Sequence, residues 1–305
     1  MPSSFEMQTS PNQVGLTVGQ CATLACVLEA TAPKPGNVHR GADFEDLTYP
    51  DLVLSGIVIG PELDRASQRP LGETILAAVQ ATRRVVATNS NLGMILLLAP
   101  LAAATGPKSP LGREAGTRPV ATEDVCRVLD GLTRDDARLV YEAIRLAKPG
   151  GLGKVETADV AGKPPDSLIE AMRLAADRDL VARQYANGFA EVFGDVVPAL
   201  RNALARFPLY QAIVYAYLQV LVEHSDSLIA RKCGADVAER ASDHAAQIIA
   251  SAKPGDEAWH ELVADFDFWL RSDGHRRNPG ATADLITAGL FVTLWEGTLR
   301  PPFES

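Results

Sequence analysis

The sequence predicts an all-α protein, built as a single multi-helix, bundle-like domain that two long loops interrupt. Ala and Leu dominate the composition while aromatic residues make up only 6%, which favours helices over strands. Most of the chain shows helical periodicity, and alternating strand patterns bounded by turns are absent. With 305 residues and 47% hydrophobic content, the chain can bury a large core. We expect roughly ten to thirteen helices in one helical catalytic domain over residues 16–305. Residues 1–15 are expected to be disordered or extended.

The first third of the chain predicts four helical segments. Residues 16–31 are expected to form a helix that ends before Pro33, because the residue before a proline is pushed out of the helical region. Residues 51–63, with the apolar run LVLSGIVIG, fit either a helix or a strand. Residues 71–88 predict an amphipathic helix, and residues 91–104 a buried helix.

Two Gly- and Pro-rich loops, Thr105–Pro119 and Lys148–Asp166, separate the later helices. We expect an interruption near Gly194 and Pro198, and one long helix over 208–232 that is apolar at first and polar at its end. The predicted helices after the first loop are 122–130, 133–147, 166–176, 179–204, 208–232, 235–251, 256–272 and 281–297.

Charge and composition exclude several classes of function. The net charge is −9 and no basic stripe with interleaved aromatic residues is present, so a nucleic-acid partner is not expected. The longest apolar run, Leu92–Ala104, is too short for a bilayer span of about 20 residues and contains Pro100. The start of the chain lacks the features of a secretory signal, and the four cysteines have no zinc-binding spacing. We therefore expect a cytoplasmic protein without a membrane partner.

The stretch EATAPKPGNVHR, Glu29–Arg40, combines a rigid turn with polar side chains. Pro33 and Pro35 fix the backbone, and Gly36 permits a tight turn. Such a loop suits an anion, with Lys34 as a point charge and Arg40 as a fork for phosphate oxygens. The alternative is a solvated connector between helices.

A second polar stretch, TNSN, lies between strongly apolar flanks. If Asn89 and Asn91 are buried at a helix start, their amides need hydrogen-bond partners. They either cap the following helix, for which Asn89 is well placed, or bind the polar edge of a ribose or base.

Two further acids stand in stretches that suggest metal or phosphate binding. Asp226 precedes Arg231 and Lys232, so a Mg²⁺ ion with a substrate phosphate would have neutralising charges nearby. The alternative for this stretch is the polar end of an apolar helix. Asp284 follows Asn-Pro-Gly in the first turn of a predicted helix. It either belongs to a second Mg²⁺ or phosphate locus or complements the helix dipole.

Together these four stretches resemble the motifs of the triphosphoribosyl-dephospho-CoA synthase family. That family is helical and joins ATP to dephospho-CoA by ribosyl transfer, with release of adenine. Its Glu followed by Pro-Lys-Pro-Gly corresponds to Glu29 and residues 33–36, and its valine to Val38. Its Pro-Gly-Gly-Ser-Ala-Asp-Leu corresponds to residues 279–285 and is the most specific match. The similarity extends from Glu29 to Phe291, most of the chain.

Several positions depart from the family pattern and indicate a divergent branch. His39 replaces an acid, Asp43 replaces a histidine, and Glu45 stands for a following Asp. Leu92 replaces the lysine of the middle Asn-Thr-His-Lys-Gly motif. The motif that starts Asp-Thr-Asn begins here at Asp226. Relatives of such a branch are associated with methanopterin-type one-carbon cofactors as well as with lyase prosthetic groups, so the acceptor stays open.

The resemblance implies a Mg²⁺-dependent transferase acting on ATP and a nucleotide-like acceptor. Asp226 and Asp284 would hold Mg²⁺, directly or through water. Glu29 or Glu45 would take the proton of the attacking hydroxyl, with His39 as a rival because its ordinary pKa is near neutral. The residues expected to bind phosphates, ribose or base are Lys34, Arg40, Asn89, Asn91, Arg231 and Lys232.

Two alternatives belong to other functional classes. A helical hydrolase would use water instead of the acceptor and would release the base without one. A non-catalytic nucleotide-binding protein would explain the altered His, Lys and Asp positions. The sequence leaves open whether the protein forms a homo-oligomer.

Overall fold

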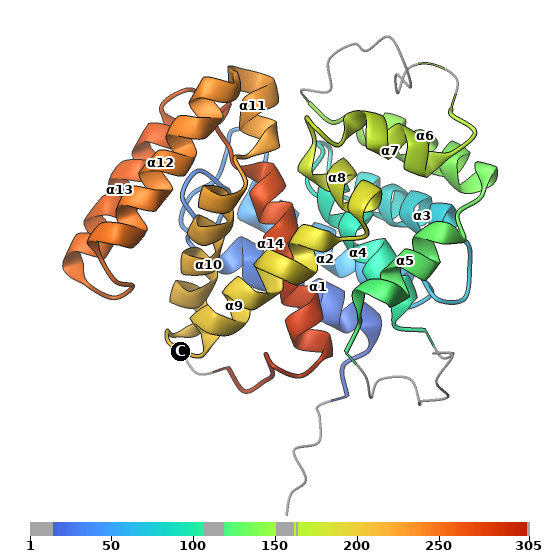
Figure 1. Ribbon diagram of the computed structural model, residues 1–305, viewed down its shortest axis with the longest axis horizontal. Coiled ribbons are helices and arrows are strands. Elements are labelled where there is room, and N and C mark those ends of the chain that lie inside the picture. The colour runs from blue at the N-terminus through green and yellow to red at the C-terminus, as the bar shows by residue number, and fades with distance from the viewer. Residues whose placement is uncertain (1–14, 107–118, 151–161, 163, 304–305) are drawn as a thin grey trace, which may run out of the picture.

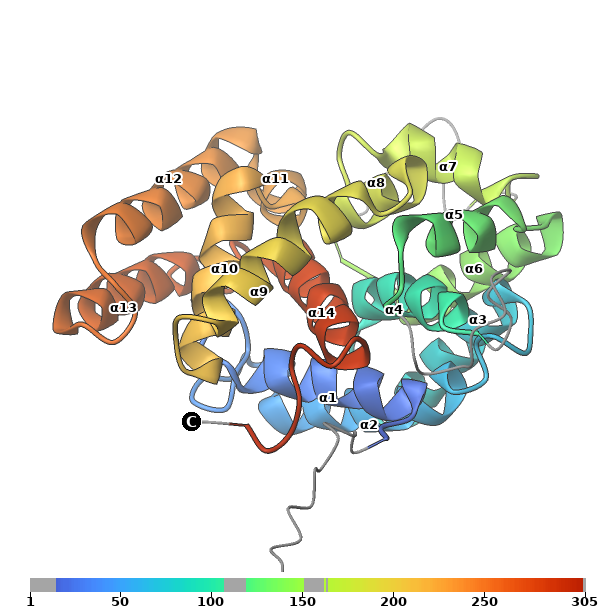
Figure 2. The same cartoon turned by 60° about the horizontal axis from the view of Figure 1, so that its bottom comes forward.

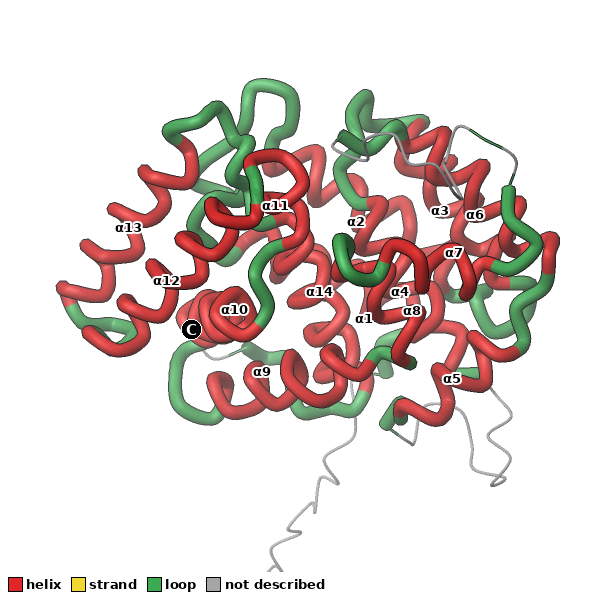
Figure 3. Tube along the Cα trace, turned by 45° about the horizontal axis from the view of Figure 1, so that its top comes forward, coloured by secondary structure: helices red, strands yellow, loops and turns green. Residues whose placement is uncertain are grey.

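The computed structural model describes residues 15–106, 119–150, 162 and 164–303. The described residues form fourteen α-helices and one π-helical turn, and they contain no β-strand, which confirms the all-α fold (Figure 3). Segment 1–14 and most of the two predicted loops lie outside these residues. None of the helices in the described ranges combines the length and the apolar character that a membrane crossing needs.

The first two helices, α1 (Val18–Thr31) and α2 (Tyr49–Leu63), approach each other closely where small residues face one another (Figure 2). A Cβ atom on Gly19 would lie 2.1 Å from the carbonyl oxygen of Gly60, so neither position has room for a side chain. Segment 51–63, for which a strand was the alternative, is therefore part of a helix.

Six helices follow and form one side of the molecule, on the right in Figure 1. These helices are α3 (Leu71–Arg83), α4 (Leu92–Ala104), α5 (Thr122–Asp130), α6 (Arg134–Ala147), α7 (Leu168–Ala175) and α8 (Leu180–Asn187). Helix α3 ends five residues before the predicted end at residue 88.

The remaining elements form the opposite side and the centre (Figures 1 and 2). These elements are η1 (Val192–Val196), α9 (Val197–Leu204), α10 (Leu209–Glu223), α11 (Ser227–Cys233), α12 (Ala235–Ser251), α13 (Glu257–Arg271) and α14 (Gly280–Trp295). The helix predicted over 179–204 is interrupted at Gly188, whose left-handed backbone (φ 71°) ends α8, and again by the π-helical turn η1.

The prediction of a single helix over 208–232 is wrong, because α10 ends at Glu223 and a separate helix, α11, begins at Ser227. His224 has an extended backbone, and the Asp226 carboxylate accepts hydrogen bonds from the backbone N–H groups of Leu228 and Ile229. An aspartate in this position starts a new helix. This break contributes to a helix count above the expected ten to thirteen.

Helix α14 lies in the middle of the molecule, between α9–α13 on one side and α3–α8 on the other (Figure 1). It contacts α1, α4, α8, α9, α10 and α11. Of its sixteen residues, all but Gly280, Asp284 and Trp295 are buried. Asp284 is thus a carboxylate on a helix that is otherwise almost fully enclosed, which makes its surroundings the natural place to look for a site.

Candidate active site

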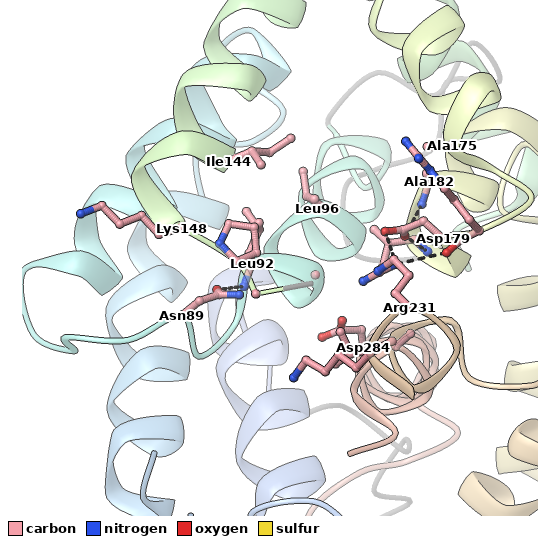
Figure 4. A pocket seen from close by; sticks show the side chains of 18 of the residues that line it. Asn89, Leu92, Leu96, Ile144, Lys148, Ala175, Asp179, Ala182, Arg231 and Asp284 are labelled. Atoms are coloured by element: carbon pink, nitrogen blue, oxygen red, sulfur yellow. Dashed lines mark hydrogen bonds and ion pairs between the residues drawn. The ribbon is translucent and has the colours of Figure 1, made fainter. Parts of the chain in front are cut away.

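A cavity of about 790 Å³ opens where α14 meets α4, α6, α7, α8 and α11 (Figure 4). Asn89, Arg231 and Asp284 line it together, although they come from three distant stretches of the sequence. Lys232 also lines it. The helical topology therefore brings together four of the site residues that the sequence predicted.

Asp284 lies against the start of α4. A Cβ atom on Gly93 would come within 1.9 Å of the Asp284 Oδ2 atom, so only glycine leaves space for the carboxylate. Burial raises the pKa of Asp284 well above its ordinary value, and the nearby carboxylates of Glu29, Asp226 and Asp179 raise it further, while Arg231 opposes them. The cavity thus holds a carboxyl group whose raised pKa follows from burial and from neighbouring acids.

Arg231 pairs with an acid that the sequence analysis did not single out. Its Nη1 atom lies 2.6 Å from the Asp179 Oδ2 atom, and its Nε–H is buried with no hydrogen-bond partner among the described residues. The other Asp179 oxygen accepts from the backbone N–H groups of Val181 and Ala182 and so caps α8. This ion pair joins α8 to α11 at the cavity wall (Figure 4).

The cavity wall concentrates positive charge in a protein whose net charge is −9. Its acidic lining residues are Asp46, Asp179 and Asp284. Its basic lining residues are more numerous and come from α6, α11 and the connections after α6 and α7: Arg145, Lys148, Arg178, Arg231 and Lys232. A concave site with converging cations attracts polyanions such as nucleotide phosphates.

Asp226 does not line the cavity, and its carboxylate is fully buried. One oxygen caps α11, and the other accepts from the backbone N–H and the hydroxyl of Thr282, both at 2.8 Å. Two donors to each oxygen fill the acceptor capacity of a carboxylate. Asp226 therefore ties the start of α11 to the start of α14, and a metal bound directly would have to displace these donors.

Glu29 and Lys34 form a buried ion pair, with Lys34 Nζ 2.9 Å from Glu29 Oε1. Lys34 is completely buried and also donates to the carbonyl oxygens of Glu29 and Ala32, so its three donors are used inside the protein. Burial raises the pKa of Glu29, although Lys34 opposes this, and its Oε2 atom is buried without a partner among the described residues. Neither side chain lines the cavity.

Hydrogen bonds to the buried Tyr217 and Asn37 side chains and to the half-buried Asp267 hold the rest of this loop. The Tyr217 hydroxyl donates to the carbonyl oxygen of Pro35 and accepts from the amide of Asn37, both at 2.9 Å. The backbone N–H of Gly36 donates to Asp267, and its φ of 79° requires glycine. These hydrogen bonds anchor the loop that the sequence predicts to be stiff.

The three exposed or half-buried candidates of this region lie outside the cavity lining. Burial, together with Lys34 and Arg271, lowers the pKa of His39 to about 4. Arg40 lies over the ring of Tyr210, with its Cζ atom 5.9 Å from the ring centroid. Glu45 is exposed. Their predicted roles in proton transfer and phosphate binding stay predictions.

The two asparagines differ in position. Asn89 lines the cavity and accepts a hydrogen bond from the backbone N–H of Leu92 (3.2 Å), the first residue of α4, while the N-cap position itself is Asn91 (Figure 4). Asn91 is buried, and its amide nitrogen has no partner among the described residues. Leu92 faces the cavity where the family motif has lysine.

Several lining residues escaped the sequence analysis. Lys148 and Arg178 follow helix ends, where a basic residue reads as ordinary complementation of the helix dipole. Phe44 and His275 come from loops that meet only in the folded chain. Asp179 has the sequence signature of a helix cap, and it is one. No three or more His, Cys, Asp or Glu side chains in the described ranges cluster as a metal site would require.

Comparison with known proteins gives a consistent picture. Residues 16–302 match the family model described as ATP:dephospho-CoA triphosphoribosyl transferase. A crystal structure from Archaeoglobus fulgidus, described as a "putative triphosphoribosyl-dephospho-coA synthase", is similar with a TM-score of 0.61 and 26% identity. The similarity covers 80% of this chain and 99% of that one. No curated protein sequence matches.

The family match extends over nearly the whole described chain, whose helices enclose a cavity lined by basic side chains. The predicted resemblance is confirmed, and this protein, a transferase, belongs to the ATP:dephospho-CoA triphosphoribosyl transferase family.

Proposed function

We propose that the protein transfers the triphosphoribosyl group of ATP to a hydroxyl group of dephospho-CoA or a related acceptor. The bond between ribose C1′ and the adenine nitrogen breaks, and a bond forms between C1′ and the acceptor oxygen. Adenine leaves with the electron pair of the broken bond and ends neutral, because the proton released by the hydroxyl balances its charge. In this kind of transfer C1′ develops oxocarbenium character.

The observation that supports this most is the convergence of three distant stretches in one cavity. Asn89, Arg231 and Asp284 line the same 790 Å³ space, which also carries Lys148 and Arg178. The cations would hold the triphosphate, while Asn89 offers its amide to ribose or base. ATP binding therefore explains both the charge and the polarity of the lining.

A Mg²⁺ ion would fit at Asp284 only with substrate phosphates as further ligands. Asp284 has no hydrogen-bond donor among the described residues, and carboxylates combined with phosphates are a usual magnesium environment. The cation would neutralise triphosphate charge. Asp226 would act behind it, by holding the start of α14 through Thr282. Magnesium should therefore stabilise the native protein with ATP in a thermal melt, and the Asp284→Asn variant much less.

For the proton acceptor we propose Glu29. Its Oε2 atom has no donor among the described residues, and its charge acts on Asp284 across the wall of the cavity. The raised pKa of Glu29 favours proton uptake at this carboxylate.

Leu92 is the reason to include acceptors other than dephospho-CoA. Its apolar side chain lines the cavity at the position of the family's lysine, so this chain offers one cation fewer. An acceptor with less phosphate charge than dephospho-CoA would suit that change.

Adenine release from ATP, followed by chromatography, tests the proposal. Native protein with Mg²⁺ should release adenine when dephospho-CoA is added and not without it. Release without any acceptor would instead identify a ribosyl hydrolase. Absence of adenine with dephospho-CoA and with other hydroxyl-bearing nucleotides would overturn the transferase proposal. Arg240→Ala, on the exposed surface of α12, serves as the control variant.

A further inference from the structure

Two aromatic rings from different loops are stacked at the cavity. The ring centroids of Phe44 and His275 are 4.6 Å apart, and the ring planes differ by 21°. Phe44 belongs to the connection between α1 and α2, and His275 to the connection between α13 and α14. Both side chains line the cavity.

Phe44 is held firmly from behind. It packs against the small apolar cluster of Ala30, Val38 and Leu52. The guanidinium carbon of Arg271 lies 5.3 Å from its ring centroid, and Arg271 is itself paired with Asp267 at 2.8 Å. These contacts hold the Phe44 ring in place, and the His275 ring stacks on it.

His275 is held in an unusual backbone conformation. Its φ is 53°, a left-handed value that residues other than glycine rarely adopt. The preceding residue, Gly274, has a φ of 55°. The Nε2 atom of His275 lies 3.8 Å from the Asp46 carboxylate. With an exposed fraction of 35%, the imidazole keeps open surface at the cavity. The fold thus accepts backbone strain to present this ring.

We propose that His275, backed by Phe44, is a stacking platform for an adenine ring. The inference rests on the proposed function, because it takes the ligand to be ATP or dephospho-CoA, both of which carry adenine. Flat aromatic side chains bind bases through their faces. The cavity provides the matching second half of a nucleotide site, since Lys148, Arg178 and Lys232 line it and suit phosphates.

The test measures binding of ATP, dephospho-CoA and inorganic tripolyphosphate to full-length variants by calorimetry. His275→Gly removes the ring at a backbone angle that glycine adopts freely, so the fold should survive. His275→Phe keeps an aromatic face but removes the imidazole nitrogens. His244→Ala is the matched control, because His244 also contacts aromatic rings, those of Phe266 and Trp269, but does not line the cavity.

We expect His275→Gly to bind the nucleotide that stacks there about tenfold more weakly, while His275→Phe and His244→Ala bind it nearly as the native protein does. The nucleotide that loses affinity, ATP or dephospho-CoA, identifies which adenine occupies the platform. Affinity for tripolyphosphate should not change in any variant.

Three results would overturn the platform. These are unchanged affinity of His275→Gly for both nucleotides, equal losses in His275→Phe and His275→Gly, and a parallel loss for tripolyphosphate. Equal losses would show that the imidazole acts as a cation or proton carrier. Adenine release is scored separately: if the native protein binds ATP through His275 yet transfers nothing, the platform stands and the proposed reaction fails. If it binds neither nucleotide, both fail.

Discussion

Asp284 shows how a carboxyl group with a raised pKa couples the stability of the fold to pH. Burial and three neighbouring carboxylates raise its pKa, so the folded protein keeps a proton that the unfolded chain, with an ordinary aspartate pKa near 3.9, releases. Above that pH the unfolded state binds fewer protons, so rising pH favours unfolding until the folded-state pKa is passed. The contribution of protonated Asp284 to the free energy of unfolding is therefore complete at low pH and is lost as the pH rises.

Replacing Asp284 with asparagine should therefore weaken the pH dependence of stability. The free energy of unfolding of the native protein should fall between about pH 5 and about pH 8, and Asp284→Asn should show a shallower fall, because it cannot ionise. Glu29 and Asp226, whose pKa values are also raised, add to this fall, whereas His39, whose pKa is lowered to about 4, opposes it below about pH 6.5. Urea unfolding at both pH values measures this.

Asp265→Asn, an exposed aspartate on α13, is the control and should unfold with the native slope. An Asp284→Asn protein with that same slope would contradict the assignment of the raised pKa. The substitution should also abolish adenine release, which is measured separately from stability.

Gly93 tests the same carboxylate from its other side. In Gly93→Ala the new methyl group would occupy the space of Asp284 Oδ2, so the carboxylate must turn away. A displacement of about 1 Å can cost about 100-fold in rate, and we expect a loss of that order in adenine release. Overpacking should lower the free energy of unfolding by about 1–3 kcal/mol.

Gly131→Ala is the matched control, since its nearest atoms would lie at an ordinary 3.5 Å. Steady-state adenine release and urea unfolding compare the two variants. Full activity in Gly93→Ala would show that the position of Asp284 does not matter for catalysis.

Lys34 illustrates what the sequence could not reveal about single residues. A lysine in a Pro-Gly loop suggests an exposed charge. The exposed fraction of the side chain depends on tertiary packing, however, and here it is zero because Glu29 lies beneath it. Residue type and spacing identified the group, but only the fold shows which way it points.

At the scale of elements, Asp226 links two helix starts. Its carboxylate caps α11 and accepts two hydrogen bonds from Thr282 in the first turn of α14. Asp226→Asn replaces one oxygen with a donor, so either the α11 cap or the Thr282 pair is lost. Because hydrogen bonds to a charged group contribute about 1.5–3 kcal/mol, the free energy of unfolding should fall by about 3 kcal/mol.

Thr282→Ser and Thr282→Val separate this role from metal binding. The serine keeps the hydroxyl and should be close to native, whereas the valine leaves one carboxylate acceptor unfilled and should lose stability by about 1–3 kcal/mol. Urea unfolding gives both values. If Asp226→Asn were as stable as the native protein but lost magnesium-dependent stabilisation, Asp226 would be a metal ligand and not a link between helices.

The helices themselves were largely readable from the sequence, because periodicity and caps are local. Thr48 and Thr133 form capping boxes with Asp51 and Asp136 at the starts of α2 and α6. The break at Asp226 was missed because the polar run EHSDS, residues 223–227, is also what the polar end of one long apolar helix would look like. The second oxygen of Asp226 accepts from Thr282, which is 56 residues away, and no local pattern predicts such a partner.

At the scale of the whole molecule, a protein with a charge of −9 gathers basic side chains in one cavity. The motifs predicted part of this set, Arg231 and Lys232. Arg178 and Lys148 come from chain connections whose position depends on how α6, α7 and α8 pack. Their joint field is therefore a property of the fold.

That field should make ATP binding depend on salt and on Arg178 and Lys148 together. Between about 0.1 M and about 1 M salt the screening length falls from about 10 Å to about 3 Å, so native affinity for ATP should drop. At low salt, Lys148→Ala/Arg178→Ala should bind ATP about tenfold more weakly, since each exposed charge contributes about 0.2–1 kcal/mol. Arg138→Ala/Arg240→Ala removes the same charge from exposed positions outside the cavity and should stay near native affinity. At high salt the two double variants should converge on the native value. If the two double variants instead bind ATP with equal, weakened affinity at low salt, binding depends on total charge alone, and the cavity cations do not contact the triphosphate.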